Sequence, residues 1–264
     1  MSDWRLLKLE TRNAFMNMAI DEAVLKARIA RMVPNTLRFY RWKPSAVSIG
    51  RFQRFSEEVH VENCRRQGVD IVRRITGGGA VYHDYEGEIT YSVVVGEKDL
   101  GSRDVASAYN LICRGLIEAA RILGVNADFS PGNPKHCPNI TMSGRKFSGS
   151  AQFHKKGVLL QHGTFLVQTD LEKMFTFLRV PWAESLEDVL RVARKKLTSI
   201  ERELKSSISN KEACEALAGG FQKALKTELV EEDLTDYEGS LAEELCREKF
   251  ATDNWNFKGN NFKR

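Results

Sequence analysis

One segment of the chain has a composition that suits direct contact with a ligand. Residues 73–84 read Arg-Arg-Ile-Thr-Gly-Gly-Gly-Ala-Val-Tyr-His-Asp. Glycine lets the backbone approach a ligand closely, and successive N–H groups in such a turn can face an anion. If a strand precedes the glycines, Arg73 and Arg74 lie on opposite faces, so one of them can reach the same anion. A tight hairpin explains the same residues, and neither the P-loop nor the dinucleotide spacing is present.

Lys146 is the second residue with a side chain suited to chemistry. It stands between two groups of small residues, 143–144 and 148–150. Small neighbours leave space for a ligand beside a long cationic side chain. A lysine ammonium can hold a carboxylate or phosphate oxygen and offset the negative charge that develops during acyl transfer. An ordinary surface lysine is the alternative.

Three more side chains suit a transfer reaction. Cys137 lies in a proline-rich loop, residues 130–138, ahead of Lys146. A cationic neighbour would lower the pKa of its thiol and make it a nucleophile; an inert loop thiol is the alternative. His83 and His162 can each act as a base toward an amine or hydrogen-bond within a pocket wall, and we favour the wall. Two histidines in separate motifs do not make a metal site, so we predict no resident metal.

Several ordered motifs resemble those of lipoate–protein ligases and their octanoyltransferase relatives. Besides residues 73–84, the motifs are Asn-Met-Ala-x-Asp-Glu-Ala at 17–23, Leu-Arg-Phe-Tyr at 37–40, Ser-Ile-Gly-x-Phe-Gln at 48–53, Gly-Arg-Lys-x-Ser-Gly-Ser-Ala-Gln at 144–152, Gln-His-Gly-Thr at 161–164 and Trp-Asn at 255–256. The resemblance covers most of the chain. It implies the mixed α+β catalytic domain that this family shares with biotin–protein ligases, and an enzyme that attaches a lipoyl or octanoyl group to a lysine of an acceptor protein.

The resemblance also implies one pocket for the acyl chain and its adenylate. Lys146 is expected to bind the activated acyl group and polarise its carbonyl. The other residues expected in this pocket are Arg73, Thr76, Gly77, Gly78, Gly79, Ala80, Val81, Tyr82, His83, Asp84, Asn139, Gly149, Ser150, Ala151, Gln152, His162 and Gly163.

Two activation chemistries occur in the family. A ligase uses ATP and Mg²⁺ to form lipoyl-AMP or the octanoyl adenylate, whereas an octanoyltransferase takes the octanoyl group from a carrier-protein thioester through a cysteine. The unbroken glycine run resembles the ligases. Residues 88–92 depart from the ligases, which usually have asparagine near Thr90, and residues 149–152 and 157–163 resemble one group of octanoyltransferases. Asn139 stands where the ligases carry an Asn-Asp pair, so the acidic residue is missing, and Cys137 is closer to Lys146 than in the transferase pattern.

On the glycine run we predict a lipoate–protein ligase. An ATP-independent octanoyltransferase with Cys137 as nucleophile is the alternative, and a non-catalytic ligand sensor is the second alternative. The resemblance implies acceptor partners with lipoyl domains, namely the E2 component of 2-oxoacid dehydrogenases and the glycine-cleavage H protein. A ligase of this length would act with a small accessory subunit, and a transferase with an acyl carrier protein.

Composition and charge fit a cytoplasmic protein. The net charge of +5 is spread along the chain without a basic stripe, so no nucleic-acid partner is expected. No apolar run approaches ~20 residues, which predicts no membrane span, and the first residues lack the apolar stretch of a signal peptide. The five cysteines include no Cys-x-x-Cys pair, which favours reduced thiols over a disulfide framework or zinc ribbon.

The elements that must position these residues mix both periodicities. Alternating or β-branched patterns predict strands at 36–42, 46–50, 69–74, 88–95, 145–152 and 158–168. Helical patterns cover 16–30, 104–123, 187–196, 211–226 and 241–250. Strict β-α-β alternation is lacking, so we predict an α+β fold of mixed β-sheets packed with helices. We expect one catalytic domain over residues 1–264, a helical C-terminal segment from about residue 170 to 264, and no separate accessory domain.

Overall fold

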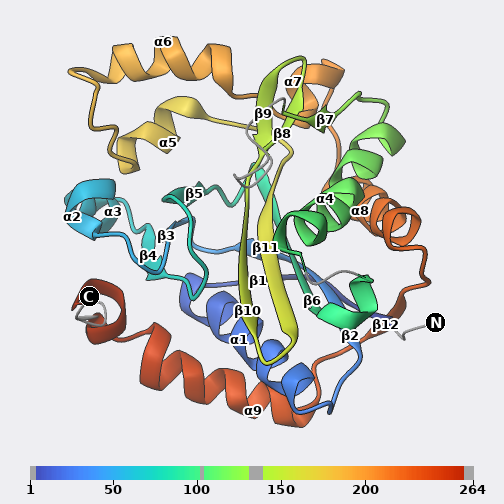
Figure 1. The fold of residues 1–264 in the computed structure, drawn as a ribbon. Helices are drawn as coiled ribbons and strands as arrows, with labels where there is room; N and C mark the ends of the chain where they lie inside the picture. The colour runs from blue at the N-terminus through green and yellow to red at the C-terminus, as the bar shows by residue number, and fades with distance from the viewer. Residues whose placement is uncertain (1–3, 102–103, 131–138, 259–264) are drawn as a thin grey trace.

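A six-stranded mixed sheet forms the centre of the molecule (Figure 1). The computed structural model describes residues 4–101, 104–130 and 139–258. The strand order is β10-β11-β6-β2-β1-β12. The bounds are β1 Trp4–Arg12, β2 Asn35–Trp42, β6 Glu88–Gly96, β10 Ser150–Lys155, β11 Val158–Leu166 and β12 Val230–Glu232. Strand β6 is buried along its whole length, which explains its run of β-branched residues.

Two three-stranded sheets complete the β-structure. One has the order β4-β3-β5 and the other the order β7-β8-β9. Their bounds are β3 Ala46–Ile49, β4 Asp70–Arg73, β5 Val81–His83, β7 Asp128–Phe129, β8 Ile140–Met142 and β9 Arg145–Ser148. Because β4 and β5 both pair with β3, from opposite sides, the glycine segment crosses from one edge of its sheet to the other.

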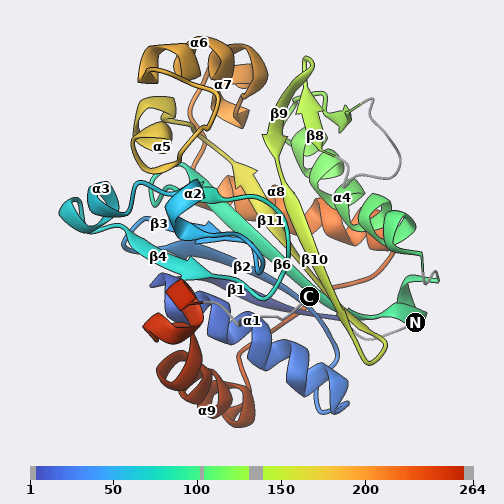
Figure 2. The ribbon, with the colours of Figure 1, turned by 60° about the vertical axis from the view of Figure 1, so that its left-hand side comes forward.

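Helices cover both faces of the central sheet (Figure 2). Helices α1 (Ala14–Ile29) and α9 (Asp236–Leu245) pack on one face, and α4 (Val105–Ile122) and α8 (Asn210–Leu225) pack on the other. The backbones of α4 and α8 approach closely because both are glycine at the crossing: a Cβ on Gly220 would lie 2.4 Å from the carbonyl oxygen of Gly115.

The remaining helical elements are short. Helices α5 and α6 lie above the sheet β4-β3-β5 in both views (Figures 1 and 2). The bounds are α2 Phe55–Glu58, α3 Val61–Arg66, α5 Leu171–Phe177, α6 Leu186–Lys196 and α7 Ile200–Leu204, with helical turns η1 Glu97–Leu100, η2 Cys246–Phe250 and η3 Asn254–Lys258. Within the described ranges, no helix combines the length and apolarity needed to cross a bilayer.

The predicted α+β class is confirmed, and four of the five predicted helices are present within two residues of their expected bounds. The fifth, expected at 241–250, is α9 followed by the turn η2, so it begins five residues earlier. Asn13 caps α1, since its side chain accepts a hydrogen bond from the backbone N–H of Met16. Asn17, one turn further along α1, is buried and accepts a hydrogen bond from Arg38. The sequence patterns missed the first and last strands, β1 and β12, which pair in parallel although more than 200 residues separate them.

The predicted strand over residues 145–152 is wrong as a single element. It divides at Gly149, where β9 ends and β10 begins, and the two halves belong to different sheets. The loop at residues 130–138 lies almost wholly outside the described residues. The segment after residue 170 is mainly helical, as expected, and it also contains β12 at the edge of the central sheet. That one domain spans the whole chain stays a prediction.

Candidate active site

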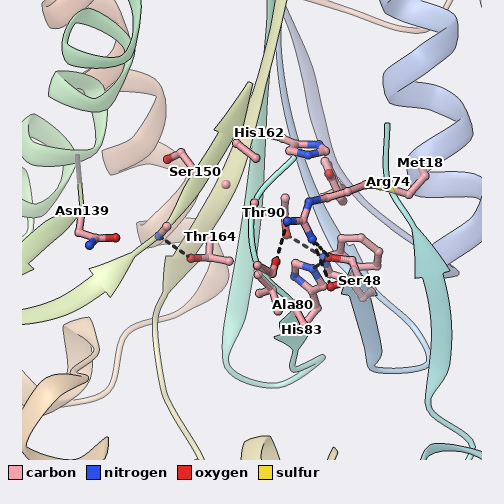
Figure 3. Close-up of a pocket in the computed structure, with 18 of the residues that line it drawn as sticks. Met18, Ser48, Arg74, Ala80, His83, Thr90, Asn139, Ser150, His162 and Thr164 are labelled. Carbon is pink, nitrogen blue, oxygen red and sulfur yellow. Dashed lines mark hydrogen bonds between the residues drawn. The ribbon is translucent and has the colours of Figure 1, made fainter. Parts of the chain in front are cut away.

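A cavity of about 270 Å³ lies where the three sheets meet. Its walls come from α1, from the central strands β2, β6, β10 and β11, from β3 and the glycine segment, and from β9. The lining residues are Met18, Tyr40, Trp42, Ser48, Arg74, Gly78, Gly79, Ala80, Val81, His83, Thr90, Asn139, Lys146, Gly149, Ser150, Ala151, His162, Gly163 and Thr164. Figure 3 shows Arg74 between His83 and His162, with Asn139 and Ser150 on the opposite side.

The division of the strand at Gly149 places Lys146 at this cavity. Lys146 lies on β9, whereas Ser150 and Ala151 begin β10 in the central sheet. The turn packs tightly on β11, because a Cβ on Gly163 would lie 2.5 Å from the carbonyl oxygen of Gly149. Small residues at both positions therefore bring the lysine-bearing strand and the central sheet to one wall.

The glycine segment wraps around the guanidinium of Arg74. This group donates to the carbonyl oxygens of Gly77 at 2.8 Å and Gly79 at 2.7 Å. Gly78 has a φ of +91°, which only glycine adopts without strain. The loop also packs against Gly50, where a Cβ would lie 2.1 Å from the carbonyl oxygen of Gly78. Glycine is thus required at Gly78 for the backbone conformation and at Gly50 for close approach of the loop.

His162 lies in a buried hydrogen-bonded chain. Its Nδ1 is 2.8 Å from Asp21 Oδ2, and its Nε2 is 2.8 Å from Thr76 Oγ1. Burial lowers the pKa of His162 more than the neighbouring Asp21 raises it, so the ring is neutral near pH 7. Burial also acts to raise the pKa of Asp21, but the hydrogen bond from His162 and the charge of Arg38 outweigh it and lower the pKa, so Asp21 is ionised.

His83 occupies a second chain of the same kind. Its Nε2 is 2.8 Å from Ser48 Oγ and its Nδ1 is 2.8 Å from Glu88 Oε1. The ring stacks on Trp42 with centroids 4.0 Å apart. The Trp42 Nε1–H donates to Thr90 at 2.7 Å, and Thr90 donates to Glu88. These contacts hold the imidazole edge at the cavity.

The structure brings twelve of the predicted pocket residues to the cavity, Lys146 included. Six lie elsewhere: Arg73, Thr76, Gly77, Tyr82, Asp84 and Gln152. Thr76 and Gly77 stand behind the wall as partners of Arg74. Tyr82 packs on Phe177, and Gln152 donates to Gln161.

Arg73 and Asp84 bind other parts of the chain. The guanidinium of Arg73 donates to the backbone carbonyls of Asn256, Gly50 and Gln53, which ties β4 to η3. Asp84 forms an ion pair with Lys173 at 2.8 Å. Between the two adjacent arginines, the sequence favoured Arg73 for the pocket, whereas Arg74 is the one that lines it.

Seven lining residues were not among those predicted. They are Met18, Tyr40, Trp42, Ser48, Arg74, Thr90 and Thr164. All except Trp42 fall inside segments compared with the family above. Had every such segment been predicted to line the pocket, six of the seven residues would have been found. Trp42 stands at the end of a strand with no local signal for a site.

Cys137 lies outside the described residues, and Asn139, two positions later in the sequence, lines the cavity. The other four cysteines are free thiols outside the lining set, and Cys113 contacts it from behind, with its Sγ 3.7 Å from Ser150 Oγ. Burial raises the pKa of Cys64 and Cys214 to about 11 and also raises that of Cys246. These raised pKa values make the three thiols poor nucleophiles at neutral pH.

The fold and the cavity define a class of enzymes that attach acyl groups to protein lysines, as comparison with known proteins shows. Residues 13–222 match the lipoyl protein ligase A/B catalytic domain, and the chain belongs to this family. It is 38% identical to an octanoyltransferase LipM of Brevibacillus brevis (98% of this chain, 100% of the relative) and 33% identical to that of Bacillus subtilis (97% and 98%). The family expected from the sequence is confirmed, and the protein is an enzyme of the ligase/acyltransferase class.

Solved structures show the same catalytic fold. A bipartite lipoate protein ligase from Thermoplasma acidophilum superimposes with a TM-score of 0.83 at 31% identity, covering 97% of this chain and 96% of that one. A lipoate-protein ligase A bound with ATP gives 0.80 at 32% identity, covering 96% and 98%. The structural neighbours are thus ligases, whereas these curated relatives bear the name of the alternative function, octanoyltransferase.

Proposed function

We propose that this protein is an octanoyltransferase that moves an octanoyl group from an acyl-carrier-protein thioester to a lysine of a lipoyl-domain protein. The observation that carries the proposal is the likeness to octanoyltransferases named LipM, which reaches 38% identity and spans both chains almost completely. This choice reverses our expectation of a ligase, which rested on the glycine run alone.

The cavity suits an eight-carbon acyl chain. Met18, Tyr40, Trp42, Val81 and Ala151 give it apolar walls, against which a hydrocarbon chain is stabilised by leaving water. Asn139 and Ser150 lie on the side opposite Arg74 and the two histidines (Figure 3), and with Lys146 of β9 they can meet the carbonyl end of the chain. Such a combination of apolar walls and a few polar groups is typical of small-molecule sites.

The reaction would proceed in two steps. The thiolate of Cys137 attacks the donor thioester, a thioester forms on Cys137, and the carrier leaves as its thiolate. The neutral amine of the acceptor lysine then attacks that thioester, the amide bond forms, Cys137 leaves as the thiolate, and the proton lost by the amine passes to solvent. The ammonium of Lys146 offsets the negative charge on the carbonyl oxygen in both steps.

The fold of the ATP-bound lipoate-protein ligase A favours a second candidate, a ligase that activates lipoate or octanoate as its adenylate. A Mg²⁺ ion accompanying ATP prefers oxygen ligands and commonly takes one or two carboxylates. The lining residues that the structure describes supply hydroxyl groups and the amide of Asn139, but no Asp or Glu side chain. The residues therefore fit Mg²⁺-ATP less well than they fit an acyl chain.

The proposed acceptor follows from a relative. The Thermoplasma acidophilum structure is described as a ligase and its E2 lipoyl domain, and we extend that acceptor class to this chain, with the glycine-cleavage H protein as a further acceptor. A transferase needs an acyl carrier protein as donor and no accessory subunit. We place the reaction in the cytoplasm, where a nucleophilic thiol stays reduced.

One experiment separates these functions. The protein is mixed with an apo lipoyl domain and either octanoyl-carrier protein or lipoate with ATP and Mg²⁺, and the acceptor mass is recorded. The proposal expects an octanoyl mass shift only with the carrier thioester. A shift only with ATP would establish the ligase, and ligand binding without any shift would indicate a sensor.

A pair of cysteine variants tests the nucleophile. Cys137→Ser should abolish octanoyl transfer and the octanoyl adduct on the enzyme. Cys214→Ser, at a half-buried thiol on α8, should retain both. Full transfer by Cys137→Ser would refute the two-step route.

A further inference from the structure

All the N–H groups of the Arg74 guanidinium donate hydrogen bonds to other groups of the protein. Its Nε–H donates to Thr76 Oγ1 at 3.1 Å, and its two Nη1 protons go to the Oγ and carbonyl oxygen of Ser48 at 3.1 and 3.2 Å. Its two Nη2 protons go to the carbonyls of Gly77 and Gly79. A guanidinium has five N–H groups, so none remains for a ligand although Arg74 lines the cavity. Burial lowers its pKa to about 10, which leaves it charged at neutral pH.

This arrangement dictates what the two hydroxyl groups do. Because Arg74 can only donate, the oxygens of Ser48 and Thr76 accept from it. Each hydroxyl proton then needs an acceptor of its own. Within the described part of the chain, the only other hydrogen-bonding groups at these hydroxyls are His83 Nε2 and His162 Nε2, each at 2.8 Å. The arrangement that gives each hydroxyl proton a protein acceptor therefore makes both Nε2 atoms unprotonated.

The opposite ring nitrogens carry the protons. His83 Nδ1 lies 2.8 Å from Glu88 Oε1, and His162 Nδ1 lies 2.8 Å from Asp21 Oδ2. Both carboxylates are buried, and each also accepts from another donor, Glu88 from Thr90 and Asp21 from Tyr40. Because an ionised carboxylate oxygen can only accept, the ring nitrogen beside it must donate. The two hydrogen-bonded chains, each running from a carboxylate through a histidine to a hydroxyl, thus end on opposite sides of one guanidinium.

We propose that Arg74 is a positioning residue that sets His83 and His162 as neutral rings protonated at Nδ1. Neither ring then has a free Nε2 lone pair for a substrate amine, so both act as parts of the wall rather than as general bases. That consequence for catalysis rests on the proposed function, whereas the protonation pattern does not.

The same side chain orients the glycine segment. C=O and N–H groups point in opposite directions across a trans peptide. Since the carbonyls of Gly77 and Gly79 face Arg74, the N–H groups of Gly78 and Ala80 point away from it. In the residues that the structure describes, no protein group accepts from these two amides, and both residues line the cavity. Arg74 thereby keeps two backbone donors available.

Nitrogen NMR of histidine-labelled protein without substrate tests the proposal, because it shows which ring nitrogens carry protons. At neutral pH, His83 and His162 should each show a protonated Nδ1 and an unprotonated Nε2. In Arg74→Met the hydroxyls are freed to accept from Nε2–H while each Nδ1–H still donates to its carboxylate, so both Nε2 atoms should be protonated at a higher pH than in the unmodified protein. Protonated Nε2 atoms in the unmodified protein, or unchanged rings in a folded Arg74→Met, would overturn the proposal.

The adjacent arginine provides the matched control. Arg73→Met removes the same charge and the same group, but that guanidinium serves Asn256 and the loop at residues 50–53. It should leave both tautomers unchanged, and altered rings in folded Arg73→Met would show that any nearby loss of charge suffices.

Single-hydroxyl variants keep the test decisive if the arginine variants fail to fold. Ser48→Ala should disturb only His83, and Thr76→Val only His162. Two results would contradict two separate chains joined at Arg74. One is that either variant disturbs both rings equally, and the other is that neither variant disturbs a ring.

Kinetics then read the catalytic consequence. Arg74→Met should lower kcat for octanoyl transfer about a hundredfold, with a smaller effect on the KM of the donor, and added guanidinium should restore part of kcat. A raised KM for the donor with an unchanged kcat would assign Arg74 to donor binding instead. If unmodified protein transfers no octanoyl group, the proposed function fails while the NMR result still judges the protonation pattern.

Discussion

The side chain of Lys146 passes over the backbone of Gly149: a Cβ added at Gly149 would lie 3.0 Å from Lys146 Nζ and 3.1 Å from Cε. Gly149 is the point where one predicted strand divides between two sheets, so the same glycine shapes the chain and leaves room for the lysine. Its conformation is open to other residues, since its φ is not positive.

A methyl group at Gly149 is therefore expected to displace the ammonium without unfolding the chain. For Gly149→Ala we expect about a tenfold to hundredfold loss of octanoyl transfer, because misplacement of a reacting group is costly, with a thermal midpoint near that of the parent. Acceptor mass against time and a melting curve measure both. Gly239→Ala, where a Cβ meets nothing within 4 Å, is the control and should keep full activity.

Removal of the Lys146 ammonium tests its proposed role directly. Lys146→Ala should lower acyl transfer by roughly 10²–10³-fold, the usual loss for one group that stabilises an oxyanion, while the circular dichroism spectrum stays unchanged. Lys155→Ala, at the exposed end of β10, should transfer normally. Substantial turnover by Lys146→Ala would remove this lysine from the mechanism.

Acid should destabilise the fold through His162. Its pKa in the folded state lies below the usual 6.5 because the ring is buried, so below pH 6.5 the unfolded chain takes up a proton that the folded chain does not. The free energy of unfolding then falls as pH falls, by at most about 1.4 kcal/mol per pH unit for this one group. Urea unfolding between pH 7.5 and 5.5 should show the slope.

The variant His162→Gln should flatten that slope. The window lies above the range in which Asp21 titrates, because the folded pKa of Asp21 is below its usual 3.8. An unchanged slope in His162→Gln would mean that other groups carry the pH dependence.

Arg73 is predicted to act on stability rather than on ligand binding. Its guanidinium holds the carbonyl of Asn256, and its backbone N–H donates to the Asn256 side chain at 2.8 Å. Arg73→Met should reduce the free energy of unfolding by roughly 3 kcal/mol, because several buried carbonyls lose charged donors. Denaturant unfolding measures this, and Arg66→Met at an exposed hydrogen bond should change it by less than about 0.5 kcal/mol. If Arg73→Met kept normal stability but bound the octanoyl donor more weakly, Arg73 would be a ligand-binding residue after all.

Local patterns were enough for much of the fold. Helix α4 could be predicted because its apolar spacing and the terminating Gly124 agree, and in the structure Asp104 caps its first turn. The α+β class followed from the mixture of such patterns. Strands β1 and β12 escaped detection because their pairing joins the two ends of the chain, and no local pattern carries a long-range register.

The candidate site shows the same division. By itself the sequence predicted one ligand site formed by residues 73–84 and Lys146, since residue types and motif resemblance are local properties, and the structure brings residues 78–81, His83 and Lys146 to one cavity. Only the tertiary structure decided that Arg74 and not Arg73 faces the cavity, and that Gly149 divides a strand between two sheets. The physical reason is that alternation along a strand places neighbouring side chains on opposite faces but does not tell which face is directed to the cavity. Packing against β3, η3 and the central sheet decides which face that is.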